Sequence, residues 1–94
     1  MKVYISGAVT GKKDFNRHAF YLAESYLDLN GYQSINPLRN TEYKPEKKWL
    51  DYMREDIVLL MRCDAIYMIP GWMTSRGAWC ERVIAWFLRY KVVK

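Results

Sequence analysis

Two acidic side chains fall within helix faces that are otherwise apolar. Asp56 lies inside the apolar face of a helix predicted over residues 46–62, and Glu81 inside that of a helix predicted over residues 74–90. Burying a carboxylate is costly unless it has a partner or a chemical role. Two acids in unlike environments can divide nucleophilic and proton-transfer work between them. The alternative for Asp56 is a structural salt bridge to a neighbouring arginine.

The stretch between the two acids predicts a place for an anion. Residues 65–69 form a buried strand, residues 70–72 a tight Pro-Gly-Trp turn, and the next helix begins at about Thr74 or Ser75. The free backbone N–H groups and the positive dipole end of such a helix suit a phosphate. After the first strand, Gly7 and Gly11 bracket small residues, and this turn lets the backbone approach a ligand closely.

The elements that must position these acids alternate along the chain. Short β-type runs at residues 3–5, 32–35, 65–69 and 91–94 are separated by helical patterns at residues 14–30, 46–62 and 74–90. This alternation predicts a parallel sheet with helices on both faces. We therefore expect one domain over residues 1–94, a three-layer α/β/α sandwich of the Rossmann or flavodoxin type with strand order 2-1-3-4. The carboxyl ends of strands one and three then lie side by side at the ligand site.

The first helix and the segment after the second strand are predicted in more detail. Asp14 is the predicted N-cap of the helix, and Gly31 is its stop. Its expected buried face comprises Phe15, Ala19, Leu22, Tyr26 and Leu29. Residues 38–45 are polar, contain a proline and are expected to form a mobile loop or lid.

Composition and charge exclude several classes of protein. The 94 residues carry a net charge of +5, which suits a partner with phosphates, but the basic residues are spread along the chain and argue against nucleic acid. Two cysteines without metal spacing and a single histidine predict no metal or cofactor. The apolar runs are far shorter than ~18 residues, and nothing resembles a signal peptide, so we expect a cytoplasmic protein without a membrane partner.

The helix that carries Glu81 has a second apolar face on its opposite side. That face comprises Trp79, Val83, Trp86 and Tyr90. A helix that is apolar on both sides is buried on both sides, and so many rings exceed what a chain of this size can cover. We therefore predict a homo-oligomer, such as a dimer, through this face. The alternative is that the chain itself wraps the helix.

Three segments together resemble the nucleoside 2-deoxyribosyltransferase-like superfamily. They are the stretch Tyr4–Gly11, the helix that carries Asp56, and the spacing Ser75-x-Gly77-x-x-x-Glu81. The resemblance covers nearly the whole chain, and within the superfamily the chain is similar to small phage and bacterial proteins of unassigned function. It implies cleavage or exchange of the N-glycosidic bond of 2′-deoxynucleosides or of their 5′-monophosphates.

The resemblance also implies a role for individual residues. Glu81 would be the nucleophile that attacks the anomeric carbon, Asp56 would orient or protonate the leaving base, and Tyr4 would hold the nucleophile in place. The residues implied to bind the substrate, including its 5′-phosphate or 5′-hydroxyl, are Gly7, Ala8, Thr10, Gly11, Ser75, Arg76 and Gly77. Trp72 could stack on the base, or it could be a packed ring behind the turn.

Three functions from different classes are compatible with these observations. The first is an N-glycosidase acting on a 2′-deoxynucleoside or its 5′-monophosphate, with Glu81 as nucleophile. The second is a catalytically silent module, such as a phage-encoded one, that binds or sequesters a nucleotide. The third is a structural or nucleic-acid-binding protein, which the scattered charge disfavours. Release of free base separates the first from the second, and salt-dependent binding to nucleic acid would identify the third.

Overall fold

Four parallel strands form the sheet at the centre of the molecule. A computed structural model of the chain describes residues 1–9, 13–40 and 46–94. The strands are β1 (Lys2–Ser6), β2 (Gln33–Ile35), β3 (Ala65–Met68) and β4 (Lys91–Val93). They lie in the order β2-β1-β3-β4 with every pair parallel, as predicted. β1 is therefore a central strand, and its Tyr4 pairs with Ile35 on one side and Ile66 on the other.

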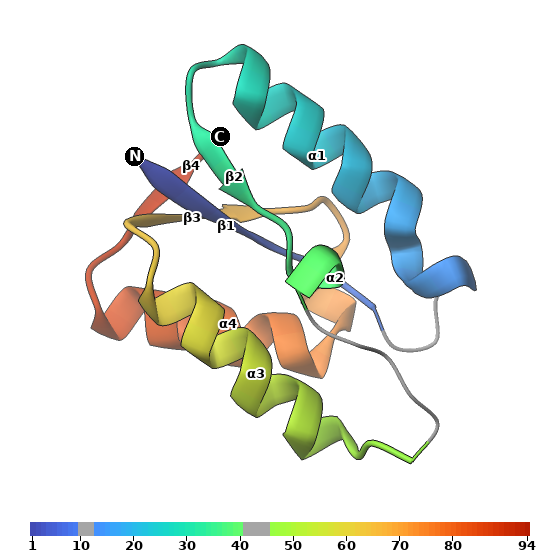
Figure 1. The fold of residues 1–94 in the computed structure, drawn as a ribbon. Helices are drawn as coiled ribbons and strands as arrows, with labels where there is room; N and C mark the ends of the chain where they lie inside the picture. The colour runs from blue at the N-terminus through green and yellow to red at the C-terminus, as the bar shows by residue number, and fades with distance from the viewer. Residues whose placement is uncertain (10–12, 41–45) are drawn as a thin grey trace.

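Helices cover both faces of this sheet, which confirms the three-layer α/β arrangement (Figure 1). The helices are α1 (Arg17–Leu29), α2 (Pro37–Asn40), α3 (Trp49–Met61) and α4 (Arg76–Phe87), and short 3₁₀ turns, Lys13–Asn16 and Trp72–Thr74, precede α1 and α4. α1 packs on one face, and α3 and α4 lie together on the other. The two faces have separate hydrophobic cores because the side chains of a strand alternate between them.

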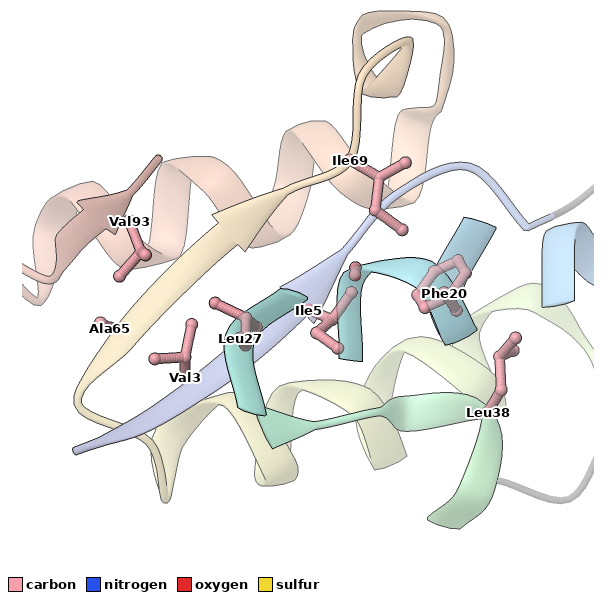
Figure 2. Close-up of a cluster of buried hydrophobic side chains, with 9 residues drawn as sticks. Val3, Ile5, Phe20, Leu27, Leu38, Ala65, Ile69 and Val93 are labelled. Carbon is pink, nitrogen blue, oxygen red and sulfur yellow. The ribbon is translucent and has the colours of Figure 1, made fainter. Parts of the chain in front are cut away.

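Successive side chains of β1 point to opposite faces of the sheet. Val3 and Ile5 point into the core beneath α1, where Figure 2 shows them close to Leu27 and Phe20. Tyr4 belongs to the opposite core, on the side of α3 and α4. Ser6, two residues further on, lies on that same side of the strand and is also buried. A tyrosine and a serine of one strand thus face the helix that carries Glu81.

The predicted buried face of α1 is wrong. The helix buries Phe20, Ala23 and Leu27, whereas Leu22 and Tyr26 are exposed and Leu29 is 87 % exposed. The two sets of positions differ by one residue, and one residue rotates a helix face by about 100°. The helix has two stripes of apolar residues at helical spacing. The stripe that packs on the sheet is not the predicted one. Among the predicted positions, Ala19 packs at the edge of the core, and the side chain of Phe15 lies outside the described part.

The starts of the helices also differ from the predictions. Asn16, not Asp14, precedes α1; Asp14 lies in the preceding 3₁₀ turn with a positive φ of 50°. α3 begins at Trp49, where the Asp51 carboxylate accepts a hydrogen bond from the Lys48 backbone N–H at 3.0 Å. Residues 37–40, expected to be mainly loop, form α2, and the rest of the expected lid, residues 41–45, lies outside the described residues. In the described ranges, none of the helices combines the length and apolarity needed to cross a membrane.

Candidate functional site

A cavity of about 210 Å³ lies at the carboxyl end of β1, between that strand and the helices α3 and α4. Its polar lining residues are Tyr4, Tyr52, Asp56, Ser75 and Glu81. Its apolar walls come from Phe20, Pro37, Trp49 and Met53. Ligand pockets in open α/β sheets occur at this edge, where strand ends and helix starts converge. The structure therefore brings both predicted acids to one cavity.

Glu81 lies on the inner face of α4 and is only 5 % exposed. Its two carboxylate oxygens each accept a short hydrogen bond: Oε2 from the Tyr4 hydroxyl at 2.6 Å and Oε1 from the Ser6 hydroxyl at 2.6 Å. Both donors come from β1, at positions two residues apart on the same side of the strand. The carboxylate is thus held in one orientation by the central strand of the sheet.

The environment of Glu81 changes its acidity. Burial raises its pKa from the ordinary 4.5 to about 7, and the negative charge of Asp56 acts in the same direction. The hydrogen bonds from Ser6 and Tyr4 oppose this rise because they stabilise the charged form. A carboxyl group with a pKa near neutrality can be present both as an acid and as a carboxylate under ordinary conditions, which suits a catalytic group.

Asp56 lies on α3 and is 7 % exposed, so it is nearly as buried as Glu81. It shares the cavity lining with Glu81, and its charge acts on the pKa of that residue. The two acids come from neighbouring helices on one face of the sheet. Two carboxyl groups from different helices thus line one cavity, an arrangement that can give them separate chemical roles.

The start of α4 forms another part of the cavity lining. Ser75 is its N-cap, and its Oγ accepts a hydrogen bond from the Ala78 N–H at 3.2 Å. The N–H groups of Arg76 and Gly77, in the same first turn, have no acceptor within the helix. Ser75 and Gly77 line the cavity. This end of α4 therefore presents donors and a positive dipole end towards a ligand.

Two glycines lie in close packing at the site. A Cβ on Gly7 would lie 2.9 Å from the Cβ of Ile69, which leaves no room for a side chain. A Cβ on Gly77 would lie 3.1 Å from the Met53 sulfur and 3.7 Å from the Trp49 indole nitrogen. Gly7 thus lets β1 pass close to the end of β3, and Gly77 lets α4 approach α3 at the cavity.

Two of the predicted substrate-binding residues, Ala8 and Trp72, are not part of the cavity lining. Ala8 is buried but is not part of the lining, and its carbonyl accepts a hydrogen bond from the Asn16 amide at 3.0 Å. Thr10 and Gly11 lie outside the described residues. Trp72 lies away from the cavity and contacts Trp79 edge to face, with ring centroids 4.7 Å apart. The turn directs Trp72 to the outer side of α4, so the structure does not place it against a base in this cavity.

Arg76 lies beside the cavity rather than in its lining. Its guanidinium stacks on the Trp49 ring, 3.8 Å from the ring centroid. The contact joins the first turns of α3 and α4.

Ser6, Trp49 and Tyr52 are among the residues of the site that were not predicted as such. Ser6 was detectable, because residues two apart on a strand point the same way and Tyr4 was already assigned. Trp49 and Tyr52 precede Asp56 by seven and four residues, so helical spacing places them on its face. An apolar residue at such spacing is ordinarily core, and only the open cavity shows that these rings line a site.

The outer face of α4 carries a shallow groove. We name this groove, lined by Trp72, Trp79, Arg82, Val83 and Trp86, the tryptophan face. Trp79 is 47 % and Trp86 65 % exposed. Tyr90, predicted to lie with them, follows the end of α4 and turns inward, where its hydroxyl donates a hydrogen bond to the Leu60 carbonyl at 3.0 Å. Tyr90 is therefore not part of this face.

Within the described residues, no three His, Cys, Asp or Glu side chains are grouped so that they could hold a metal ion. Cys63 is buried, and burial raises the pKa of its thiol to about 11. A thiol this weakly acidic is not a nucleophile near neutral pH. The carboxyl groups of the cavity are thus the better candidates for chemistry.

Comparison with known proteins places the whole chain in a family but assigns it no activity. No curated protein matches the sequence. The match to the family spans every element of the sheet and both acids of the cavity. Residues 1–94 match the family described as a domain of unknown function, DUF4406, and the chain belongs to that family.

Proposed function

We propose that the protein is an N-glycosidase that cleaves the bond between base and sugar in a 2′-deoxynucleoside or its 5′-monophosphate. The observation that carries this proposal is the pair of buried acids in one cavity, with Glu81 held through both oxygens by Tyr4 and Ser6. The resemblance to the nucleoside 2-deoxyribosyltransferase-like superfamily, noted from the sequence, points to the same reaction.

Cleavage of an N-glycosidic bond develops positive charge on the sugar ring. The Glu81 carboxylate forms a bond to the anomeric carbon as the bond to the base breaks, and Asp56 supplies a proton to the departing nitrogen. Water then attacks the glycosyl–enzyme ester, Asp56 takes the proton of that water, and the Glu81 carboxylate is restored. A desolvated carboxylate interacts more strongly with the developing cation than a hydrated one, because less water screens the charge.

The cavity favours a small ligand. Its volume of about 210 Å³ is below the range typical of pockets for drug-sized molecules, ~300–1,000 Å³. Trp49 and Tyr52 offer rings for a base, while Ser75 and the first turn of α4 offer donors for a 5′-phosphate or 5′-hydroxyl. A single nucleoside unit meets these features better than a polymer does.

The test is incubation with a panel of 2′-deoxynucleosides and their 5′-monophosphates, with free base read by chromatography. Wild-type protein should release base, and Glu81→Gln should not, because the amide keeps the shape but is not a nucleophile. Absence of free base from every substrate, with protein shown to be folded by circular dichroism, would reject the proposal.

A binding module without turnover is the second candidate. The observation that favours it is the raised pKa of Glu81, because the protonated form of the acid is not nucleophilic. This candidate predicts thermal stabilisation by a nucleotide without release of base. A ligand at one hundred times its Kd adds ~2.7 kcal/mol to the free energy of unfolding, which a melting experiment resolves readily.

We also propose that two copies of the chain associate through the tryptophan face. With the neighbouring side chains of Met73 and Phe87, this face exposes on the order of 600 Å² of apolar surface, taking ~150–250 Å² for a whole aromatic side chain. That is the upper end of what a monomer carries and approaches the ~800 Å² per partner of a stable interface. Trp79 also donates to the Met73 carbonyl at 2.7 Å, so a dimer would support the turn that leads to Ser75.

Sedimentation at micromolar concentration tests the dimer. We expect twice the chain mass of 11.3 kDa for wild type and a monomer for Trp86→Lys. Leu29→Lys, on the exposed side of α1, is the matched control and should remain dimeric. A wild-type monomer would contradict the proposed interface.

A further inference from the structure

We propose that the cavity selects N-glycosides whose base ring carries a positive charge, such as pyridinium or N7-alkylated purine nucleosides. This inference rests on the proposed glycosidase function and names the class of substrate. It is carried by the charge of the cavity lining and by the chemistry of the rings around it.

The charged groups that line the cavity are acids. Asp56 and Glu81 belong to the lining, whereas none of the lining residues in the described ranges is a lysine, arginine or histidine. The negative charge of Asp56 is felt at Glu81, where it acts with burial to disfavour a second negative charge. A cation in the cavity would relieve this repulsion and stabilise both carboxylates, whereas a neutral base would not.

Two rings of the cavity wall already attract cations that are not part of the lining. The Arg76 guanidinium lies 3.8 Å from the centroid of Trp49, and the Lys47 ammonium lies 5.5 Å from the centroid of Tyr52. Neither basic group is among the lining residues. Arg76 shows in particular that a planar, delocalised cation stacks on this indole. Aromatic walls combined with buried acids are the usual chemistry of a cation-binding pocket.

A cationic base also simplifies the reaction. When the bond to the sugar breaks, the ring nitrogen keeps the electron pair and the base leaves as a neutral molecule, so no proton has to be supplied. The Glu81 carboxylate bonds to the anomeric carbon as the bond to the base breaks. Water later displaces the carboxylate from that carbon, and Asp56 accepts the proton of the water and passes it to solvent. During the first step the positive charge moves from the base to the sugar, and the lining acids stabilise it throughout.

The first experiment measures affinity by calorimetry, with probes that contain no cleavable bond. 1-Methylnicotinamide, a permanent cation, is compared with neutral nicotinamide. We expect the cation to bind at least about tenfold more tightly, the ratio that a desolvated cation–π contact alone supports. Glu81→Gln should reduce that ratio severalfold, whereas Glu46→Gln, which removes an exposed acid, should leave it unchanged. Equal affinity for the two probes, or tighter binding of nicotinamide, would overturn the inference.

The second experiment measures base release from matched nucleosides. The 2′-deoxyriboside of nicotinamide is compared with its neutral dihydro form, and 7-methyl-2′-deoxyguanosine with 2′-deoxyguanosine in mildly acidic buffer, where the methylated ring keeps its charge. Faster release of base from the charged member of a pair supports the inference. The pair with the larger ratio of rates shows whether the preferred base is a pyridinium or an N7-alkylated purine. Release from neutral 2′-deoxynucleosides without preference for charge would leave the glycosidase standing and refute the inference. Tight binding of the cations without any release would support the selection and reject the glycosidase.

Discussion

Replacing Glu81 by glutamine should make the protein more stable at alkaline pH. The folded protein holds the Glu81 proton to a pKa of about 7, whereas the unfolded chain releases it near 4.5. Between these values the folded state binds more protons than the unfolded state, so the free energy of unfolding falls as the pH rises. The fall begins near 4.5 and is complete above about 7.

The difference between 4.5 and about 7 corresponds to a loss of about 3 kcal/mol in wild type, at about 1.4 kcal/mol for each pH unit. Glutamine has no proton to lose and escapes this cost. Its amide must form hydrogen bonds with the hydroxyls of Tyr4 and Ser6 in place of the carboxyl group. We expect one of these bonds to be weaker, which should lower the free energy of unfolding by about 1 kcal/mol. Glu81→Gln should therefore be slightly less stable than wild type near pH 4 and about 2 kcal/mol more stable near pH 8.

Urea unfolding of the two proteins from about pH 4 to 8 provides the assay, with the free energy of unfolding extrapolated to water. Acids that do not interact with Glu81 titrate equally in both proteins, so the difference between them reports on position 81 and its coupling to Asp56. Glu46→Gln, at an exposed acid, is the control and should follow wild type throughout. A difference between wild type and Glu81→Gln that does not change with pH would refute the assignment of a buried acid with raised pKa.

Three further substitutions test the structure around the cavity. Tyr4→Phe removes one of the two hydroxyls that stabilise the Glu81 carboxylate, so its pKa should rise further and the pH range of stability loss should extend upward in urea titrations; an unchanged range would contradict the hydrogen bond. Gly7→Ala forces a Cβ against Ile69 and should cost ~1–3 kcal/mol in urea unfolding, and a neutral effect would show that the strand ends are not in close contact. Ser75→Ala removes the N-cap of α4 and should cost about 1 kcal/mol; it should also weaken binding of a 5′-monophosphate more than that of the nucleoside, and equal losses for both ligands would place the phosphate elsewhere.

The order of the strands and the positions of the acids were readable from the sequence. Regular alternation of short apolar runs with helical patterns leaves few topologies, because parallel strands need crossover connections and these have one preferred hand. Asp56 and Glu81 were conspicuous because a carboxyl group within an apolar helix face is costly unless something is gained from it. Both patterns can be recognised in the sequence without knowing which residues are in contact in the folded chain.

The environment of those acids was only partly readable. Tyr4 and the start of α4 were predicted as parts of the site. The second hydroxyl on Glu81, from Ser6, was not predicted, and the rings of Trp49 and Tyr52 became evident only in the cavity. The spacing of Ser6 from Tyr4 shows only that both face the same side of the strand, and a ring at core spacing has no distinctive pattern. The role of each depends on which groups other elements bring within reach.

The tertiary structure alone decided how ambiguous segments are oriented. The apolar residues of α1 suit two faces, and packing on the sheet selects the one with Phe20 and Leu27. Trp72 could point either way from its turn, and contact with Trp79 places it on the outside. The sequence by itself thus determined the elements, their order and the buried acids. The spacing of apolar residues indicates the elements, and the free-energy cost of burying a carboxylate makes the two acids conspicuous. The rotation of a helix and the direction of a turn depend on contacts between distant residues, which only the folded chain establishes.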